Sequence, residues 1–294
     1  MQASFKTIGI LGRSQQADLA EVLRLLLDLL HERGLTVLLE DELAGSVGGE
    51  LPKTTGRDDI GKRSDLVIVV GGDGSLLSAA RTLAYYDAPV IGVNRGRLGF
   101  LTDVTPDLVS TQIPQVLDGE FEAEERFLLD AEVRRNDDIV ATGDAFNDVV
   151  VNSGTTGQMI EMELYIDEEF VYRQRADGLI VSTPTGSTAY SLSGGGPIMH
   201  PALDAMVLVP MFPHALSSRP IVIDDDAEVR VDILERNRIH PPVTCDGHIT
   251  MTAEPGDSVH IRKKPHSLTL LHPVGHSFYA SCRDKLRWSN ALVN

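Results

Sequence analysis

Residues 67–80, VIVVGGDGSLLSAA, join a run of branched apolar residues to a glycine-rich loop that contains a single carboxylate, Asp73. An apolar run without polar alternation predicts a strand covered on both faces of a parallel sheet. A helical spacing of apolar residues follows the loop, and we expect Ser75 to cap that helix. The segment therefore predicts one strand–loop–helix unit of an α/β fold.

The same alternation of strands and helices extends through the first 122 residues. Short apolar strands are expected at 6–12, 35–40, 65–70 and 88–94. Helices are expected over 19–30, with Gly34 just after its end, and over 75–86, whereas 56–63 should form a short helix or loop. We therefore predict a Rossmann-like parallel-sheet domain over 1–122.

The pattern changes after residue 122, where strand-like segments follow one another with polar turns between them. These segments are 128–135, 138–152, 159–167, 169–184, 227–234, 242–247, 258–264 and 266–272. Such a series predicts a mostly antiparallel, β-sandwich-like domain over 123–274. The remaining residues, 275–294, are expected to form a C-terminal arm that packs back on the N-terminal domain.

Composition narrows the possible partners and the compartment. The net charge of −17 comes without a basic face or a basic amphipathic helix, so neither nucleic acid nor a membrane surface is an expected partner. The two cysteines form no C-x-x-C pair, which favours a reducing, cytoplasmic location. The N-terminus lacks a signal-like apolar segment, and the longest apolar runs are far below the roughly 20 residues of a membrane span.

The position of Asp73 within the glycine loop needs an explanation. Glycines let backbone N–H groups approach phosphates closely, but a carboxylate there repels an anion. The arrangement makes sense if Asp73 orients a hydroxyl that attacks a phosphoryl group, or accepts its proton. The alternative is an ordinary Asp-Gly turn. The loop lacks the third glycine of G-x-G-x-x-G, and 56–63 only imitates a P-loop, because it precedes a strand.

Two further segments suit a nucleotide ligand. Residues 173–197 combine Ser and Thr hydroxyls, which suit ribose and phosphate contacts, with Tyr190, which is placed to flank a base or ribose. The alternative for this segment is a solvated Ser/Gly loop. Asn147 and Asp148 form an amide–carboxylate pair at the start of a strand, and here the alternative is a surface pair.

Taken together, GGDGS at 71–75, NRGRLGFLTD at 94–103, FNDVV at 146–150 and the long motif at 177–197 resemble the NAD kinases, most closely the ATP-using enzymes of Gram-negative bacteria. The resemblance implies a kinase that phosphorylates the 2′-hydroxyl of the adenosine ribose of NAD with ATP and a divalent cation, expected to be Mg²⁺. It also implies a homodimer or homotetramer whose sites are shared between subunits. Two rival hypotheses remain, a GGDG-type lipid or sugar kinase and a non-catalytic dinucleotide sensor.

The resemblance implies a role for individual residues. Asp73 is expected to face the ribose hydroxyl as the catalytic residue. Further NAD-binding residues are expected at Gly74, Asn147, Asp148, Gln158, Arg175, Asp177, Thr188, Ala189, Tyr190, Ser191, Leu192, Ser193 and His248. Arg175 and Asp177 are expected to approach the nicotinamide end.

Three of these positions depart from the family pattern. Asp148 stands where Glu is usual, Gln158 where Arg or His is often found, and His248 where Gln is common. No metal-binding residues are expected in the chain itself. His240, Cys245 and His248 lack zinc-ligand spacing, as do His272 and His276, and these histidines are expected on the surface or in loops. The acidic run 224–226 is expected to be a solvated turn.

Overall fold

The computed structural model describes residues 5–12, 18–46, 52–95, 99–154 and 158–288. The chain forms two compact units, Met1–Glu125 with Leu268–Asn294, and Arg126–Ser267. Among the residues described, no helix is both long enough and apolar enough to cross a membrane.

The first unit is built on a parallel sheet with the strand order β5-β4-β1-β2-β3. Its strands are β1 (Thr7–Gly12), β2 (Thr36–Glu40), β3 (Lys53–Thr55), β4 (Leu66–Val70) and β5 (Val90–Val93). Every residue of β4 is buried, as the apolar run 67–70 predicted for a strand covered on both faces.

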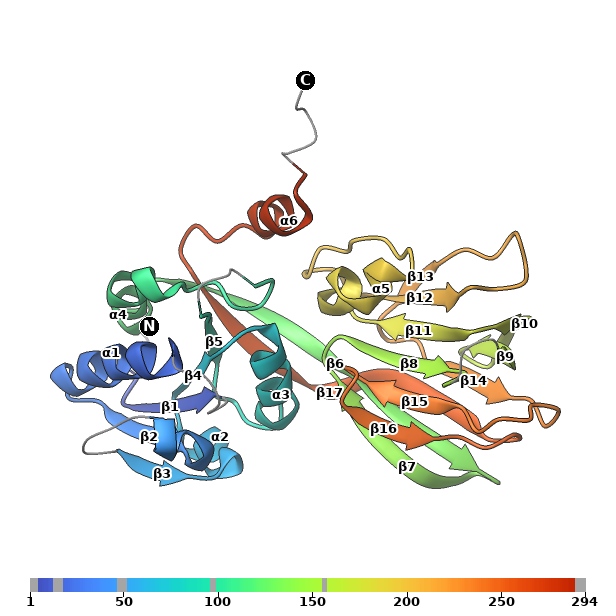
Figure 1. Cartoon of the computed structure of the whole chain (residues 1–294), viewed down its shortest axis with the longest axis horizontal. Helices are drawn as coiled ribbons and strands as arrows, with labels where there is room; N and C mark the ends of the chain where they lie inside the picture. The colour runs from blue at the N-terminus through green and yellow to red at the C-terminus, as the bar shows by residue number, and fades with distance from the viewer. Residues whose placement is uncertain (1–4, 13–17, 47–51, 96–98, 155–157, 289–294) are drawn as a thin grey trace. The chain divides into compact units, whose positions relative to one another are not determined.

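Helices cover both faces of this sheet (Figure 1). They are α1 (Asp18–Glu32), α2 (Arg57–Arg63), α3 (Asp73–Leu83) and α4 (Val109–Leu117), while α6 (Phe278–Leu286) forms near the C-terminus. α1 packs against α4, and α2 packs against α3. Gly34 follows α1 with a φ of 68°, and its N–H donates to His31 O at 2.9 Å, so it ends the helix as the sequence predicted.

The second unit contains two antiparallel sheets. One consists of β8 (Asp148–Asn152), β11 (Gly178–Ser182), β12 (Ala205–Met211), β13 (Ile221–Asp224), β15 (Pro242–Cys245) and β16 (Ile249–Thr252). The other contains β7 (Asp138–Ala145), β9 (Ile160–Ile166), β10 (Glu169–Ala176) and β14 (Val229–Ile233), together with parts of β6 (Phe121–Arg135) and β17 (Ser258–Pro273). A short helix, α5 (Tyr190–Ser193), follows β11.

A single apolar core joins the two sheets of the second unit. It contains Leu129 and Val133 from one sheet and Val149, Val151 and Leu179 from the other. Strands whose inner faces share a core in this way form a β-sandwich, the architecture that the series of short strands predicted.

The boundaries between the units differ from those in the sequence prediction, which divided the chain at 122/123 and 274/275. The units meet at 125/126 and at 267/268. Both junctions lie inside long strands, β6 and β17. Two predicted strands, 258–264 and 266–272, are in fact the continuous strand β17. Because the boundaries fall inside strands, no loop in the sequence marks them.

Candidate functional site

The Asp73 carboxylate lies in the first turn of α3, at the carboxyl end of β4. The helix begins at Asp73 and not at Ser75, because Gly72, with extended backbone, precedes the first helical residue. The prediction that Ser75 caps this helix is therefore wrong. A carboxylate in the first turn is stabilised by the helix dipole, and the carboxyl edge of a parallel α/β sheet is where ligands usually bind.

The loop after β5 holds this carboxylate. Phe100 N–H donates to Asp73 Oδ2 at 2.9 Å, and Leu101 N–H donates to Oδ1 at 3.1 Å. The Thr102 hydroxyl donates to Oδ1 at 3.3 Å. A Cβ at Gly99 would lie 1.9 Å from Asp73 Oδ1, so only glycine permits this approach. The loop belongs to the motif at 94–103, of which residues 96–98 lie outside the described part of the chain.

The glycines beside Asp73 differ from Gly99 in what surrounds them. A Cβ added at Gly72 or Gly74 would meet no atom of the described residues within 4 Å. Gly72 also has ordinary backbone angles, φ −90° and ψ −176°. Neither crowding by the protein nor an unusual conformation therefore explains the choice of glycine here. Open space next to a fixed carboxylate is what an approaching ligand requires.

In the second unit, the start of β8 and the end of β11 form one polar site. Asp148 pairs with Ser182 in the antiparallel register of these strands. The hydroxyls of Ser182 and Thr183 donate to Asn147 O at 3.1 and 3.2 Å. A Cβ at Gly186 would lie 2.2 Å from Asn147 O, so this glycine permits close contact between the loop and the strand. The motifs at 146–150 and 177–197 are therefore in direct contact.

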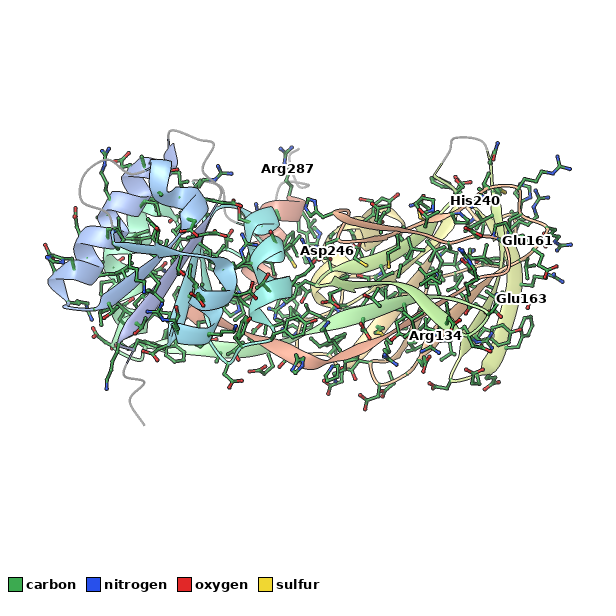
Figure 2. All side chains as sticks on the ribbon, turned by 90° about the horizontal axis from the view of Figure 1, so that it is seen from below. Arg134, Glu161, Glu163, His240, Asp246 and Arg287 are labelled. Atoms are coloured by element: carbon green, nitrogen blue, oxygen red, sulfur yellow. The ribbon has the colours of Figure 1, made fainter. Side chains whose placement is uncertain are left out.

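Asp246 anchors this arrangement, and sequence reasoning missed it. The residue is labelled in Figure 2 and lies in the turn between β15 and β16. Its carboxylate accepts from the N–H groups of Phe146, Asn147 and Asp148 at 3.0, 2.7 and 3.3 Å. The Asp-Gly dipeptide 246–247 signals a turn, but nothing in the sequence says which backbone its side chain binds. His248, which the prediction did name, is exposed two residues further on.

Asp148 is buried, and its surroundings oppose its charge. Desolvation, together with repulsion from Asp246, raises the pKa of Asp148 to about 7, against a smaller lowering by the hydrogen bond from Tyr190 N–H. This hydrogen bond ties Asp148 to the start of α5. The carboxyl group accepts hydrogen bonds as a charged group when ionised and can donate one when protonated.

Two polar atoms at this site are buried without a hydrogen-bond partner in the described residues: Asn147 Oδ1 and Ser191 Oγ. Buried polar atoms are usually satisfied, so unpaired atoms within one site indicate that a ligand completes them. Thr188 and Ala189, just before α5, are half-buried, as is Leu192 in α5. Their hydrogen bonds are local, from Thr188 Oγ1 to Thr185 O and from Ala189 N–H to Gly186 O.

Tyr190 is 46% exposed and lines a cavity of about 570 Å³. The other lining residues include Ile180, Ser193, Phe212, Leu216 and Arg219. Phe212 and Leu216 are also exposed, at 77% and 96%. This largely apolar cavity with one cationic side chain at its wall is suited to a planar ring with a nearby anionic group.

Three predicted residues lie elsewhere in the second unit. Asp177 immediately precedes β11, whereas Ser182 ends it, and five residues of strand span roughly 16 Å. Arg175 pairs with Glu161 on β9, and Gln158 precedes the same strand. Within one chain, Gln158, Arg175 and Asp177 are thus a strand's length away from Asn147 and Asp148.

One expectation about the histidines is wrong. His272 is fully buried on β17 and is neither a surface nor a loop residue. It lies with His276 and Asp103 in a cluster whose ligand-type atoms are within 4.8 Å of one another. The run 224–226 also brings three carboxylates together, but Lys263 pairs with Asp225 and Asp226 at 2.7 and 3.8 Å.

Comparison with known proteins identifies the relatives of this chain. Residues 8–121 match the family model for the ATP-NAD kinase N-terminal domain, and 146–272 match that for the C-terminal domain. The NAD kinase of Pseudomonas aeruginosa strain PAO1 is 53% identical, with 98% of each chain covered. The NAD kinase of Chromohalobacter salexigens is 54% identical, again with 98% of each chain covered.

Solved structures share the fold at lower sequence identity. Yeast NADH kinase complexed with NADH has a TM-score of 0.88 and 22% identity, covering 99% of this chain and 91% of the yeast chain. An NAD kinase from Archaeoglobus fulgidus in complex with ATP has a TM-score of 0.70 and 22% identity, covering 96% and 97%. Matches to both family models and more than 50% identity over nearly the full length assign the chain to the NAD kinase family.

Proposed function

We propose that this protein transfers the γ-phosphoryl group of ATP to the 2′-hydroxyl of the adenosine ribose of NAD, giving ADP and NADP. The observation that carries the proposal is a fixed carboxylate, Asp73, beside two glycines that no described residue crowds. The second observation is the separate polar site around Asn147 and Asp148, where Asn147 Oδ1 and Ser191 Oγ are buried without a hydrogen-bond partner in the described part of the chain.

Asp73 orients the attacking hydroxyl and accepts its proton late. An ordinary carboxylate has a pKa near ~4 and is a weak base for an alcohol. In a loose phosphoryl-transfer transition state, the hydroxyl becomes acidic only as its oxygen bonds to phosphorus, so orientation and late proton acceptance suffice. The bond from the γ-phosphorus to the ADP oxygen breaks as the new bond forms. Hydrogen bonds from Phe100 and Leu101 keep the carboxylate from rotating away.

ATP enters as its complex with a divalent cation, for which we propose Mg²⁺. Donor and acceptor are both polyanions, and the chain carries a net charge of −17. The cation bound to the phosphates therefore supplies much of the neutralisation. The chain itself contributes positioning, backbone N–H groups and the single carboxylate.

The second unit binds NAD. Asn147 Oδ1 and Ser191 Oγ would each gain a hydrogen-bond partner from the dinucleotide. Asp148 would accept from a ribose hydroxyl, and Tyr190 would stack on a ring of NAD in the cavity of about 570 Å³. Thr188, Ser193 and His248 would also contact the dinucleotide.

We further propose that each site is completed by a second copy of the chain in a homodimer or homotetramer. Support comes from the resemblance to the NAD kinases, which implies sites shared between subunits. Asn147 and Asp177 lie roughly 16 Å apart along β11, a length that an extended dinucleotide also covers, so an experiment must distinguish a site within one chain from a site shared between two. A cytoplasmic location would fit a sequence with only two cysteines and no C-x-x-C pair.

Mixing two inactive variants tests this sharing. Asp73→Asn lacks the catalytic carboxylate, and Asp177→Ala lacks the nicotinamide contact. If a site takes these residues from different chains, some sites in mixed oligomers contain both native residues, and activity returns on mixing. A mixture that exchanges subunits, as mass spectrometry would show, but stays inactive contradicts the proposal.

A GGDG-type lipid or sugar kinase is the alternative, and it is not favoured, because a family model also matches the β-rich half. The test is NADP formation from NAD and MgATP, measured with an NADP-specific dehydrogenase. Diacylglycerol and hexose phosphates serve as competing acceptors. Turnover with NAD alone supports the proposed function; turnover with another acceptor, or binding of NAD without turnover, contradicts it.

A further inference from the structure

A cluster of titratable groups around the buried His272 lies next to the loop that holds Asp73, entirely within the first unit. Asp103 follows this loop, Glu124 lies on β6, His272 lies on β17, and His276 lies just beyond β17. His272 Nδ1 contacts Asp103 Oδ2, and its Nε2 lies 3.5 Å from Glu124 Oε2. His276 Nδ1 lies 3.3 Å from the same Asp103 oxygen.

Each nitrogen of His272 therefore lies near a carboxylate, although Nε2, 3.5 Å from Glu124, makes no hydrogen bond among the described residues. Two flanking carboxylates favour the doubly protonated ring. Asp103 and Glu124 together raise the pKa of His272 to about 9, although burial alone would lower it. Asp103 in turn depends on this charge, because its Oδ1 is buried without a hydrogen-bond partner among the described residues. Nearby, Glu122 and Glu125 accept hydrogen bonds from Gly275 N–H and the Thr269 hydroxyl.

The geometry of the two rings argues against a metal ion in this cluster. His272 and His276 are stacked, with ring centroids 4.1 Å apart and planes only 18° from parallel. A metal ion lies close to the plane of each imidazole that binds it. Rings stacked in parallel cannot both direct a nitrogen lone pair at one ion unless a ring turns. The shared carboxylate of Asp103 fits the observed arrangement without any such movement.

The cluster is joined to Asp73 by a few residues of backbone. Phe100, Leu101 and Thr102 donate to Asp73, and Asp103 comes next in the chain. The next residue, Val104, pairs with Val93 of β5. Its N–H donates to Gly92 O at 3.3 Å, and its O accepts from Asn94 N–H at 2.8 Å. The donors to Asp73 are thus fixed on one side by Asp103 and His272.

We propose that His272, as an imidazolium clasped between Asp103 and Glu124, is a positioning residue for phosphoryl transfer that acts through the loop to hold the Asp73 carboxylate. This inference rests on the role proposed above for Asp73. A carboxylate displaced by about 1 Å costs up to roughly 100-fold in rate, even when the change is made away from the reacting atoms.

The test compares His272→Gln, which removes the charge, with the matched control His31→Gln on the exposed end of α1. We expect His272→Gln to lower kcat by about 10- to 100-fold, with the KM for NAD changed by less than about threefold. Above pH ~9 the wild type should lose kcat as the ring loses its proton, whereas His272→Gln should show no such fall. An unchanged kcat, or a retained pH-dependent fall, overturns the proposal.

The same effect should disappear when Asp73 is absent. In an Asp73→Asn background, His272→Gln should change kcat by less than about twofold, because coupled residues are not additive. An undiminished effect in that background shows that His272 does not act through Asp73. If Asp73→Asn alone keeps near-native turnover, the proposed role of Asp73 fails, and this result is visible without any His272 variant.

Hydrogen exchange gives a readout that does not depend on activity. We expect the Phe100 and Leu101 amides to exchange faster in His272→Gln than in the wild type, while distant strands stay protected. In the wild type, the same amides should exchange faster above pH ~9 than below it, after correction for intrinsic rates. Equal protection of these amides in both proteins contradicts the proposal that His272 holds the loop. If His272→Gln does not fold, the wild-type pH series alone decides. Faster exchange of these amides in the wild type after addition of a zinc chelator also contradicts the proposal, since it would reveal a metal site.

Discussion

Asp73 in the first unit follows the end of β4 and Asp148 in the second begins β8, but the two carboxyl groups are held differently. Asp73 is only partly buried and accepts from two N–H groups and one hydroxyl. Asp148 is 4% exposed, and Asp246, which takes the surrounding N–H groups, also repels its charge. Burial next to another carboxylate thus raises the pKa of Asp148 to about 7.

This difference suggests a division of tasks between the units. A carboxylate that is fixed by backbone donors and left open on one side is suited to orient a reacting group. A buried carboxyl group beside unsatisfied polar atoms is suited to bind a ligand that excludes water. On this account, the first unit performs the chemistry and the second selects NAD.

Replacing Asp73 by Asn should give the largest effect of any single substitution. The variant keeps the shape of the side chain and one acceptor oxygen but loses the charge and most of the basicity. We expect turnover to fall by about 10²- to 10⁴-fold, the range for positioned acid–base groups. The measurement is NADP formation at saturating NAD and ATP, with circular dichroism to confirm folding. Turnover within a few-fold of the wild type would make Asp73 a turn residue.

The second effect concerns stability and pH in the first unit. The pKa of His272 is raised from 6.5 to about 9 in the folded protein. The stabilisation of the fold by the charged ring is therefore complete below pH 6.5 and is lost as the pH rises through 9. The shift corresponds to about 3 kcal/mol. In urea unfolding, the stability advantage of the wild type over His272→Gln should shrink by about this amount between pH 6 and 9.5. An advantage independent of pH would show that His272 is not charged in the folded state.

The third effect belongs to the second unit. Tyr190→Ala should weaken NAD binding by about 1–3 kcal/mol, the range for loss of a stacked aromatic contact with a base. ATP binding should change less. Calorimetric titration with each nucleotide separates the two, and Phe212→Ala, which lines the same cavity, reports whether any apolar truncation has this effect. Unchanged NAD affinity would support the alternative that the segment 188–193 is a solvated loop.

The smallest effect compares two glycines of the first unit. Gly74→Ala should leave the fold intact, or stabilise α3 by about 0.5–1 kcal/mol, because the new methyl group meets no atom of the residues that the structure describes. Turnover should nevertheless fall, since the methyl group occupies the space left for the ligand. Gly99→Ala should destabilise the protein, because its Cβ would overlap Asp73 Oδ1. If Gly74→Ala is fully active, the open space is not used by substrate.

The architecture could be predicted because it depends on local patterns. The apolar run before Asp73 predicted the parallel sheet. The series of strand-like segments separated by polar turns after residue 122 predicted the sandwich. β3 was missed because its sequence, Lys-Thr-Thr, is a short polar edge strand without a hydrophobic signal. The strands 258–264 and 266–272 were separated because their polar junction looks like a turn.

The site was predictable only where the motif and the contact lie in the same stretch of sequence. Asp73 stands out because glycines surround it. Its donors, Phe100 and Leu101, are separated from it by 27 and 28 residues, and Asp246 is separated from Asn147 by 99. Spacing along the chain carries no information about such contacts. His272 was assigned to the surface for the same reason, since the carboxylate that holds it, Asp103, is 169 residues away.

Calorimetric NAD affinity in two matched variants tests the division of tasks most directly. Asp73→Asn and Asp148→Asn each replace one carboxylate by an amide, one in each unit. We predict that Asp73→Asn binds NAD within about threefold of the wild type, while Asp148→Asn binds about 10- to 100-fold more weakly, the range for losing a hydrogen bond to a charged group. Equal losses of affinity in both variants, or a loss confined to Asp73→Asn, would contradict the account.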